Sequence, residues 1–370
     1  MSKPRTARSA LFSWTVVVPL LAVVVLALGW GRALPLPVVG VVIVLLAGAV
    51  LAAVHHAEVV AHRVGEPYGS LVLAVAVTVI EVALIVTLMI AGAGAAETLA
   101  RDTVFAAVIL TCNGIVGLSI LVATRHRHGS VVSFNAEGAG AALATVATLT
   151  TLGLVVPNFT TSSPGPVFSA PQLAFAAITA LALYGLFVAL QTGRHRDYFL
   201  PVTADGVVID DDQHATPPST PAALTSLALL LVALIGVVGN AKLVSPSIEG
   251  GVAAAGFPVS VVGVIIAMLI LLPETLAAVR AARRGRMQIS LNLAFGSAMA
   301  SIGLTIPTIA VASIWLPVRL HLGLDPIHIV LFALTCIVTV LTVVPGRATL
   351  LQAGVHLALL AAYLFLAISP

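Results

Sequence analysis

Apolar runs, each about as long as a bilayer is thick, follow one another along the chain. A membrane-spanning helix needs about 20 predominantly apolar residues, and eleven stretches approach or exceed that length. We expect helices near 12–29, 36–57, 69–91, 103–123, 138–157, 171–192, 222–241, 256–279, 289–314, 326–344 and 348–368. This pattern predicts an all-α polytopic membrane protein.

Short segments rich in glycine, proline or charge separate the runs and predict the loops. They lie at 31–37, 63–67, 91–102, 125–130, 157–166, 242–251, 280–286 and 319–326. The first run follows a basic N-terminus like that of a signal peptide, but no small-residue cleavage site follows it. We therefore expect it to remain as a first helix.

One long hydrophilic stretch divides the sequence into two halves. It contains Asp205, Asp210, Asp211 and Asp212 and ends in TPPSTP, a composition typical of a linker. It is either a solvated connector or a segment that gathers or senses cations. The division predicts an N-terminal tail with an extra helix (1–33), a first five-helix repeat (34–192), an acidic cytoplasmic loop (193–221) and a second five-helix repeat (222–370).

Composition excludes a soluble protein. The chain is 60% hydrophobic and 8% charged, whereas soluble domains carry about 25% charged residues. The net charge of +3 does not indicate nucleic-acid binding, because the basic residues cluster between apolar runs. If the N-terminus lies inside, 13 of the 17 Lys and Arg fall inside and 4 outside. The positive-inside rule then places the N-terminus in the cytoplasm and the C-terminus outside the inner (plasma) membrane.

Two glutamates interrupt apolar runs in their middle, one in each half. A carboxylate at that depth costs several kcal/mol, so Glu81 and Glu274 are candidate functional residues. Each follows another acid, with Glu58 preceding Glu81 by 23 residues and Glu249 preceding Glu274 by 25. This weak internal symmetry is typical of inverted repeats, in which corresponding helices cross near the midplane. We therefore expect the two glutamates to meet there.

Oxygen-bearing side chains follow both glutamates on the next helix. Asn113 follows Glu81, and Ser297 and Ser301 follow Glu274. Two carboxylates with hydroxyl, amide and carbonyl oxygens suit a hard cation such as Ca²⁺, and no thiolate or imidazole accompanies them at that depth.

Simpler interpretations of the same residues stay open. Either glutamate could be a protonated structural residue, and Asn113 and Ser297 could serve helix packing. Pro273 interrupts the helix just before Glu274 and frees carbonyl groups, but it could also be a simple kink.

A polar helical face precedes Glu81. His55, Glu58 and His62 are spaced i, i+3 and i+7 and share one side of a helix. Histidine titrates near neutral pH, so His62 and Glu58, with Glu249, are candidates for proton relay or gating. The alternatives are a dedicated metal face or a solvated helix end. His356, alone in the last run, is expected to be a packed core histidine.

Three stretches resemble a known family. HHAEVVAHRVGEPYGSLVLAVAVTVIEVALI, LLPETLAAV and NLAFGSAMASIGLTIP are similar to the α-repeats of ChaA-type bacterial Ca²⁺/H⁺ antiporters, of the calcium/cation antiporter superfamily near the CAX exchangers. The resemblance implies one extra helix plus two inverted five-helix repeats, with Glu81 and Glu274 holding the ion. Val79-Ile80 and Leu272-Pro273 depart from the Gly-Asn-Ala that precedes the glutamate in many CAX relatives.

The leading hypothesis is therefore an antiporter that exchanges Ca²⁺ for H⁺ by alternating access. The same branch is also associated with Na⁺ or K⁺ exchange for H⁺, which is the alternative. A cation channel is a different class, and an intramembrane enzyme is disfavoured because His-Glu-x-x-His is absent. No cofactor or nucleic-acid partner is expected, only cations, protons and lipid, and the sequence does not indicate an oligomeric state.

Overall fold

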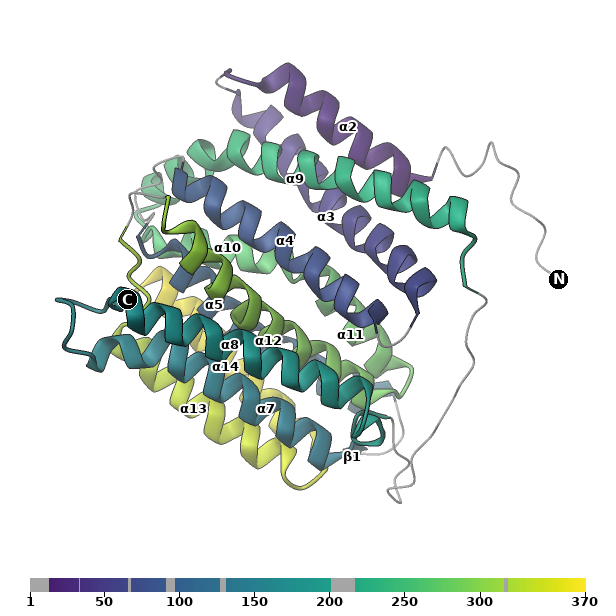
Figure 1. Cartoon of the computed structure of the whole chain (residues 1–370), viewed down its shortest axis with the longest axis vertical. Helices are drawn as coiled ribbons and strands as arrows, with labels where there is room; N and C mark the ends of the chain where they lie inside the picture. Colours follow the sequence, from purple (N-terminus) through teal and green to yellow (C-terminus); the bar gives the residue numbers. More distant parts are fainter. Residues whose placement is uncertain are drawn as a thin grey trace. The chain divides into compact units, whose positions relative to one another are not determined.

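The structure, a computed structural model, describes residues 13–32, 34–65, 68–90, 97–126, 131–200, 217–315 and 319–370. It divides into two compact units, one of residues 1–93 with 214–255 and the other of residues 94–213 with 256–370. Each unit takes helices from both halves of the sequence. The helices are labelled in Figure 1.

Besides the short 3-10 helix η4 (Arg196–Phe199), eleven helical segments occupy the described residues, and each contains most of one predicted run. They are α2 (Trp14–Gly29), α3 (Leu36–Val64), α4 (Tyr68–Ile90), α5 (Leu99–Ile109) continued by the π-helix η1 (Leu110–Ile115) and α6 (Val116–His126), α7 (Ala136–Thr150) continued by η2 (Thr151–Val155) and η3 (Val156–Phe159), α8 (Ala170–Thr192), α9 (Thr220–Ala254), α10 (Ser260–Ile270) with α11 (Leu272–Arg283), α12 (Met287–Ala312), α13 (Pro326–Val343) and α14 (Leu350–Ile368).

The lengths of these segments confirm the polytopic all-α fold class. Eight segments are long and apolar enough to cross a membrane, and α10 with α11 forms a ninth that is bent. The helix α2 and the apolar part of α4, Val75–Thr87, are shorter. These assignments concern the described residues.

Three predicted helix ends are wrong because the helices are longer than predicted. The helix α3 continues seven residues past 57 to Val64, and α9 continues past 241, through Pro246, to Ala254. The helix α5 begins at Leu99, inside the predicted loop. Apolar patterning ends where a helix leaves lipid, whereas backbone hydrogen bonds can continue into the polar interface.

In the first unit, α2 packs against α3 and α9 (Figure 1). Two buried polar side chains join it to them. Nε2 of His56 on α3 donates to the carbonyl oxygen of Thr15 at 2.9 Å, and Nδ2 of Asn240 on α9 donates to that of Ala22 at 2.8 Å. The sequence pattern predicted no role for either residue. Interhelical bonds of this kind hold helices together where lipid gives no hydrophobic driving force.

Close approach of α2 to α9 depends on Gly239. A Cβ at this position would collide with the side chain of Leu26 on α2. We expect Gly239→Ala to lower stability by about 1–3 kcal/mol, seen as a lower melting temperature in detergent. A Cβ added at Gly250, on the same helix, would have no neighbour within 4 Å. Gly250→Ala is therefore the matched control and should be neutral or stabilising by about 0.5–1 kcal/mol, and equal losses in both variants would contradict this packing.

The second unit is built around α12, which packs against α5, η1, α6, α7, α8 and α11. Its side chains Leu291, Phe295 and Met299 are fully buried. A short antiparallel pair joins β1 (Val131–Ser133) to β2 (Arg347–Thr349). The helix predicted near 289–314 is thus the core of this unit.

Candidate functional site

The helix that carries Glu274 is broken. The helices α10 and α11 meet at Leu271 with a bend of 50°. Pro273 lies in the first turn of α11, and both the backbone N–H and the Oγ1 of Thr275 donate to the carbonyl oxygen of Leu271, at 2.9 and 2.7 Å. The predicted interruption by Pro273 is confirmed, because proline lacks the N–H that a continuous helix requires.

Glu274 lies in the first turn of α11 and is half-buried. The first N–H groups of a helix have no intrahelical partner, and the dipole is positive at that end. Such a terminus favours a negative charge. The break therefore places the carboxyl group at a helix N-terminus, in the middle of an apolar pair of helices.

Other predicted ligands in the second unit come from neighbouring elements. The helix α11 packs against both α12 and η1, and α12 packs against η1. Asn113 on η1 is fully buried, Ser301 on α12 is 4% exposed and Ser297 on α12 is half-buried. A π-helical turn often marks a functional site. The fold thus brings the elements of Glu274, Asn113, Ser297 and Ser301 together.

Asn113 belongs to a buried hydrogen-bonded chain. Its Nδ2 donates to Oγ1 of Thr335 at 2.9 Å, and its Oδ1 lies 3.1 Å from Nδ1 of His356. Nε2 of His356 lies 3.1 Å from Oγ1 of Thr342. Because an amide oxygen only accepts, His356 carries a proton on Nδ1. His356 is buried, as expected for a core histidine, and it orients the Asn113 amide.

Removing the imidazole should destabilise the second unit. His356→Leu would leave Oδ1 of Asn113 without its donor, and a buried unsatisfied polar atom costs about 1–3 kcal/mol. We expect a lower melting temperature in detergent. His55→Leu, on the exposed side of α3, serves as the control and should melt like the unaltered protein. A His356→Leu variant as stable as the control would show that these hydrogen bonds contribute nothing to stability.

The remaining predicted residues belong to the first unit. Glu81 on α4 is 3% exposed, and its neighbours Ile80, Leu84 and Ile85 are fully buried. Burying a carboxyl group costs free energy unless it is neutral, paired or hydrogen-bonded. The role of Glu81 as a functional residue stays a prediction.

The predicted relay residues lie on two packed helices of the first unit. Glu58 and His62 are exposed on α3, as is His55. Glu249 lies on α9, where Oγ of Ser245 donates to its Oε1 at 2.5 Å, and α9 packs against α3. Among the described residues, no group of three or more His, Cys, Asp or Glu side chains is placed to hold a metal ion.

The second unit contains an ionic cluster that the sequence pattern did not predict. Arg101 and Asp102, expected in a loop, are helical and only 7% and 6% exposed. Nε of Arg101 lies 2.8 Å from Oδ1 of Asp102, and its Nη1 donates to the carbonyl oxygen of Gly323 at 3.1 Å. Its other terminal nitrogen lies 3.5 Å from Oδ2 of Asp325. In the sequence, the only indication of this cluster is a pair of adjacent, oppositely charged residues at the start of an apolar run.

The acidic loop cluster Asp205–Asp212 lies outside the described residues. The two cysteines are both free, Cys112 being buried and Cys336 half-buried. Both lie in apolar segments, where a free cysteine packs as a small hydrophobic side chain.

Comparison with known sequences shows that this chain matches one protein family and is similar to individual bacterial proteins along most of its length. The family model described as "Sodium/calcium exchanger protein" matches residues 34–193 and 225–369. The y4hA protein of Sinorhizobium fredii is 45% identical over 374 residues, covering 99% of this chain and 98% of that protein. The sodium-potassium/proton antiporter ChaA of Escherichia coli is 35% identical over 355 residues, covering 95% and 94%.

Solved structures share the fold. The native YfkE structure has a TM-score of 0.72 at 16% identity and covers 96% of this chain and 99% of that one. The crystal structure of the H⁺/Ca²⁺ exchanger CAX has a TM-score of 0.65 at 17% identity, covering 95% and 91%. At these identities the likeness concerns the fold alone, and it agrees with the all-α polytopic architecture.

Proposed function

Because the chain belongs to the sodium/calcium exchanger protein family, we propose that it is a proton-coupled antiporter that exchanges Ca²⁺ for H⁺ across the plasma membrane. The family consists of ion exchangers rather than enzymes. The transported ions are its substrates, and it needs no cofactor. The two matched stretches, 34–193 and 225–369, support a division into two repeats.

The break at Leu271 is the observation that carries the proposal. It bends the α10–α11 span by 50° and puts Glu274 in the first turn of α11. Transporters bind their ions near the bilayer midplane with discontinuous helices of this kind. A carboxyl group beside such a break can supply oxygen ligands to a cation, and this supports the proposal.

We assign the shared cation and proton site to Glu81 and Glu274. Asn113, Ser297 and Ser301 supply further oxygens. Oδ1 of Asn113 accepts one hydrogen bond from His356 and keeps a second lone pair for a cation. Two carboxylates, amide and hydroxyl oxygens suit Ca²⁺, which takes six to eight oxygen ligands.

Exchange follows from competition at this site. Two nearby carboxylates in a low dielectric repel each other, so the empty pair takes up protons. A divalent cation stabilises the ionised pair and displaces the protons. Either occupant neutralises the site, whereas the bare dianion would be costly to move within the membrane. Access therefore alternates only when the site is filled, and about two protons leave for each Ca²⁺.

Proton entry is assigned to the polar face of α3. Glu58 and His62 are exposed there, and Glu249 lies on the neighbouring α9. Imidazole and carboxyl groups can pass protons at physiological pH. In this proposal they serve as relay or gating groups on the cytoplasmic side, to which the distribution of Lys and Arg assigns this end of α3.

A second candidate keeps the fold and changes the ion. The 35% identity with the sodium-potassium/proton antiporter ChaA of Escherichia coli favours Na⁺ or K⁺ exchange for H⁺. The departures at Val79-Ile80 and Leu272-Pro273 also remove the asparagine oxygens of many CAX relatives. The ion is therefore the point at which the two candidates differ.

The cation profile of proton flux tests the proposal. The purified chain is reconstituted in vesicles with a ΔpH-sensitive dye, and CaCl₂, NaCl and KCl are added separately. We expect dequenching with CaCl₂ and little with the other salts. Dequenching by NaCl or KCl without CaCl₂ supports the second candidate. Electrogenic cation flux at zero ΔpH that moves no protons would instead identify a channel.

A further inference from the structure

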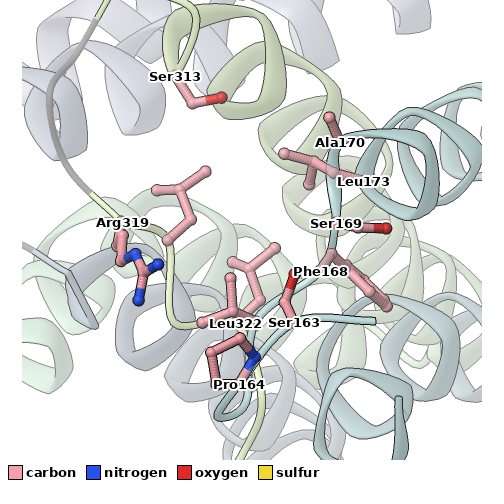
Figure 2. Close-up of a pocket in the computed structure, with 11 residues that line it drawn as sticks. Ser163, Pro164, Phe168, Ser169, Ala170, Leu173, Ser313, Arg319 and Leu322 are labelled. Carbon is pink, nitrogen blue, oxygen red and sulfur yellow. The ribbon is translucent and has the colours of Figure 1, made fainter. Parts of the chain in front are cut away.

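A pocket of about 320 Å³ lies at one end of the second unit, between the segment before α8 and the segment before α13 (Figure 2). The hydroxyl groups of Ser163 and Ser313 and the guanidinium group of Arg319 line it. Apolar side chains complete the wall, with Phe168 and Leu173 across the pocket from Arg319 in the view of Figure 2. The pocket thus combines one positively charged side chain with hydroxyl groups and an apolar wall.

Arg319 is exposed, and in the described part of the chain it forms no ion pair. Two acidic residues, Asp325 on the same segment and Glu97 beside His321, are already engaged. Asp325 contacts Arg101 and His328, at 3.5 and 3.7 Å. Glu97 lies 3.6 Å from His321. The positive charge of Arg319 is therefore open to an anion from outside the chain.

An apolar groove adjoins this pocket and shares Phe168 with it. The groove has a volume of about 300 Å³ and lies between the end of the α7–η3 segment and α8. Its lining includes Leu152, Val156, Phe175 and Ala176, and Phe175 is 64% exposed. Both α7–η3 and α8 are long and apolar enough to span the membrane, so an exposed apolar groove along them faces lipid.

We propose that the pocket and the groove form one binding site for an anionic phospholipid. The phosphate pairs with Arg319 and accepts a hydrogen bond from Ser163, because charge-assisted bonds to phosphate are the strong ones. The hydroxyl group of Ser313 only lines the pocket, because it donates its proton to the carbonyl oxygen of Ala310 at 2.7 Å. An acyl chain lies along the groove beyond Phe168. A free phosphate ion would pair with the guanidinium group of Arg319 and leave the groove empty. An amphiphile with a negative head uses both, and the bilayer supplies it.

Native mass spectrometry of the delipidated full chain tests this site. Phosphatidylglycerol, phosphatidylcholine and inorganic phosphate are titrated separately. We expect one phosphatidylglycerol to bind preferentially, and Arg319→Gln to weaken it by tenfold or more. Phe175→Ser should also weaken it, because it removes an apolar wall at an exposed position. Arg32→Gln changes an exposed arginine of the first unit and should leave binding unchanged.

Three outcomes would overturn the proposal. The first is phosphatidylglycerol binding that Arg319→Gln leaves intact. The second is an equal loss with Arg32→Gln, which would show general attraction between basic residues and anionic lipid. The third is inorganic phosphate binding as tightly as the lipid with no effect of Phe175→Ser, which would show a bare anion site.

Discussion

Glu81→Gln and Glu274→Gln are each expected to abolish cation-dependent proton flux. Glutamine keeps the size of the side chain and much of its hydrogen bonding but removes the charge and the exchangeable proton. Losing one charged partner of a buried ionic contact costs about 2–5 kcal/mol, which is roughly 30-fold or more in cation affinity. The measurement is dye dequenching in inverted vesicles on addition of the transported cation.

A matched control separates this effect from a general loss of acidic charge. Glu137 lies exposed in the first turn of α7, and Glu137→Gln should transport normally. Equal amounts of monodisperse protein on size-exclusion chromatography show that each variant has folded. If either Glu81→Gln or Glu274→Gln retains full flux, the two-carboxylate site is wrong, although the family assignment would stand.

Arg101→Met is expected to cause the largest loss of stability among the variants considered. Arg101 contacts Asp102, the carbonyl oxygen of Gly323 and Asp325. Methionine leaves Asp102, which is 6% exposed, with the hydroxyl group of Thr98 but without its charged partner. Removing one member of a buried ion pair costs about 3–5 kcal/mol, because the other charge remains buried and uncompensated. The melting temperature in detergent should fall sharply.

Two further variants show whether the burial of charge is the cause. The side chain of Asp325 is 56% exposed, so Asp325→Asn should cost about 1 kcal/mol or less. The double variant Arg101→Met with Asp102→Asn should recover part of the loss, because no buried charge is left alone. An Arg101→Met protein that melts like the unaltered one would show that the pair is dispensable.

The helices could be predicted from sequence because each spanning segment is decided locally. Lipid offers no hydrogen bonds to the backbone, so a sufficiently long apolar run must form a helix whatever its neighbours are. Pro273 likewise acts on its own helix, and the break before Glu274 was predictable. Helix ends were not, because α3 and α9 continue where the apolar pattern stops.

Other polar residues acquired their partners only in the folded chain. Asn113 was predicted as a cation ligand, and the structure shows its amide bonded to Thr335 and His356, more than 200 residues away. Arg101 is buried because segments near 323 and 325 fold over it. No local pattern contains such pairings.

An all-α membrane protein, the approximate positions of its spans and the two costly carboxylates, Glu81 and Glu274, were all predictable from the order of residues. These follow from hydropathy and from proline chemistry within one helix. The folded chain was needed to show which buried polar groups support one another, how α2 is held to α3 and α9, and which side chains line the pocket of Arg319. These depend on contacts between distant segments, which the order of residues along one helix does not specify.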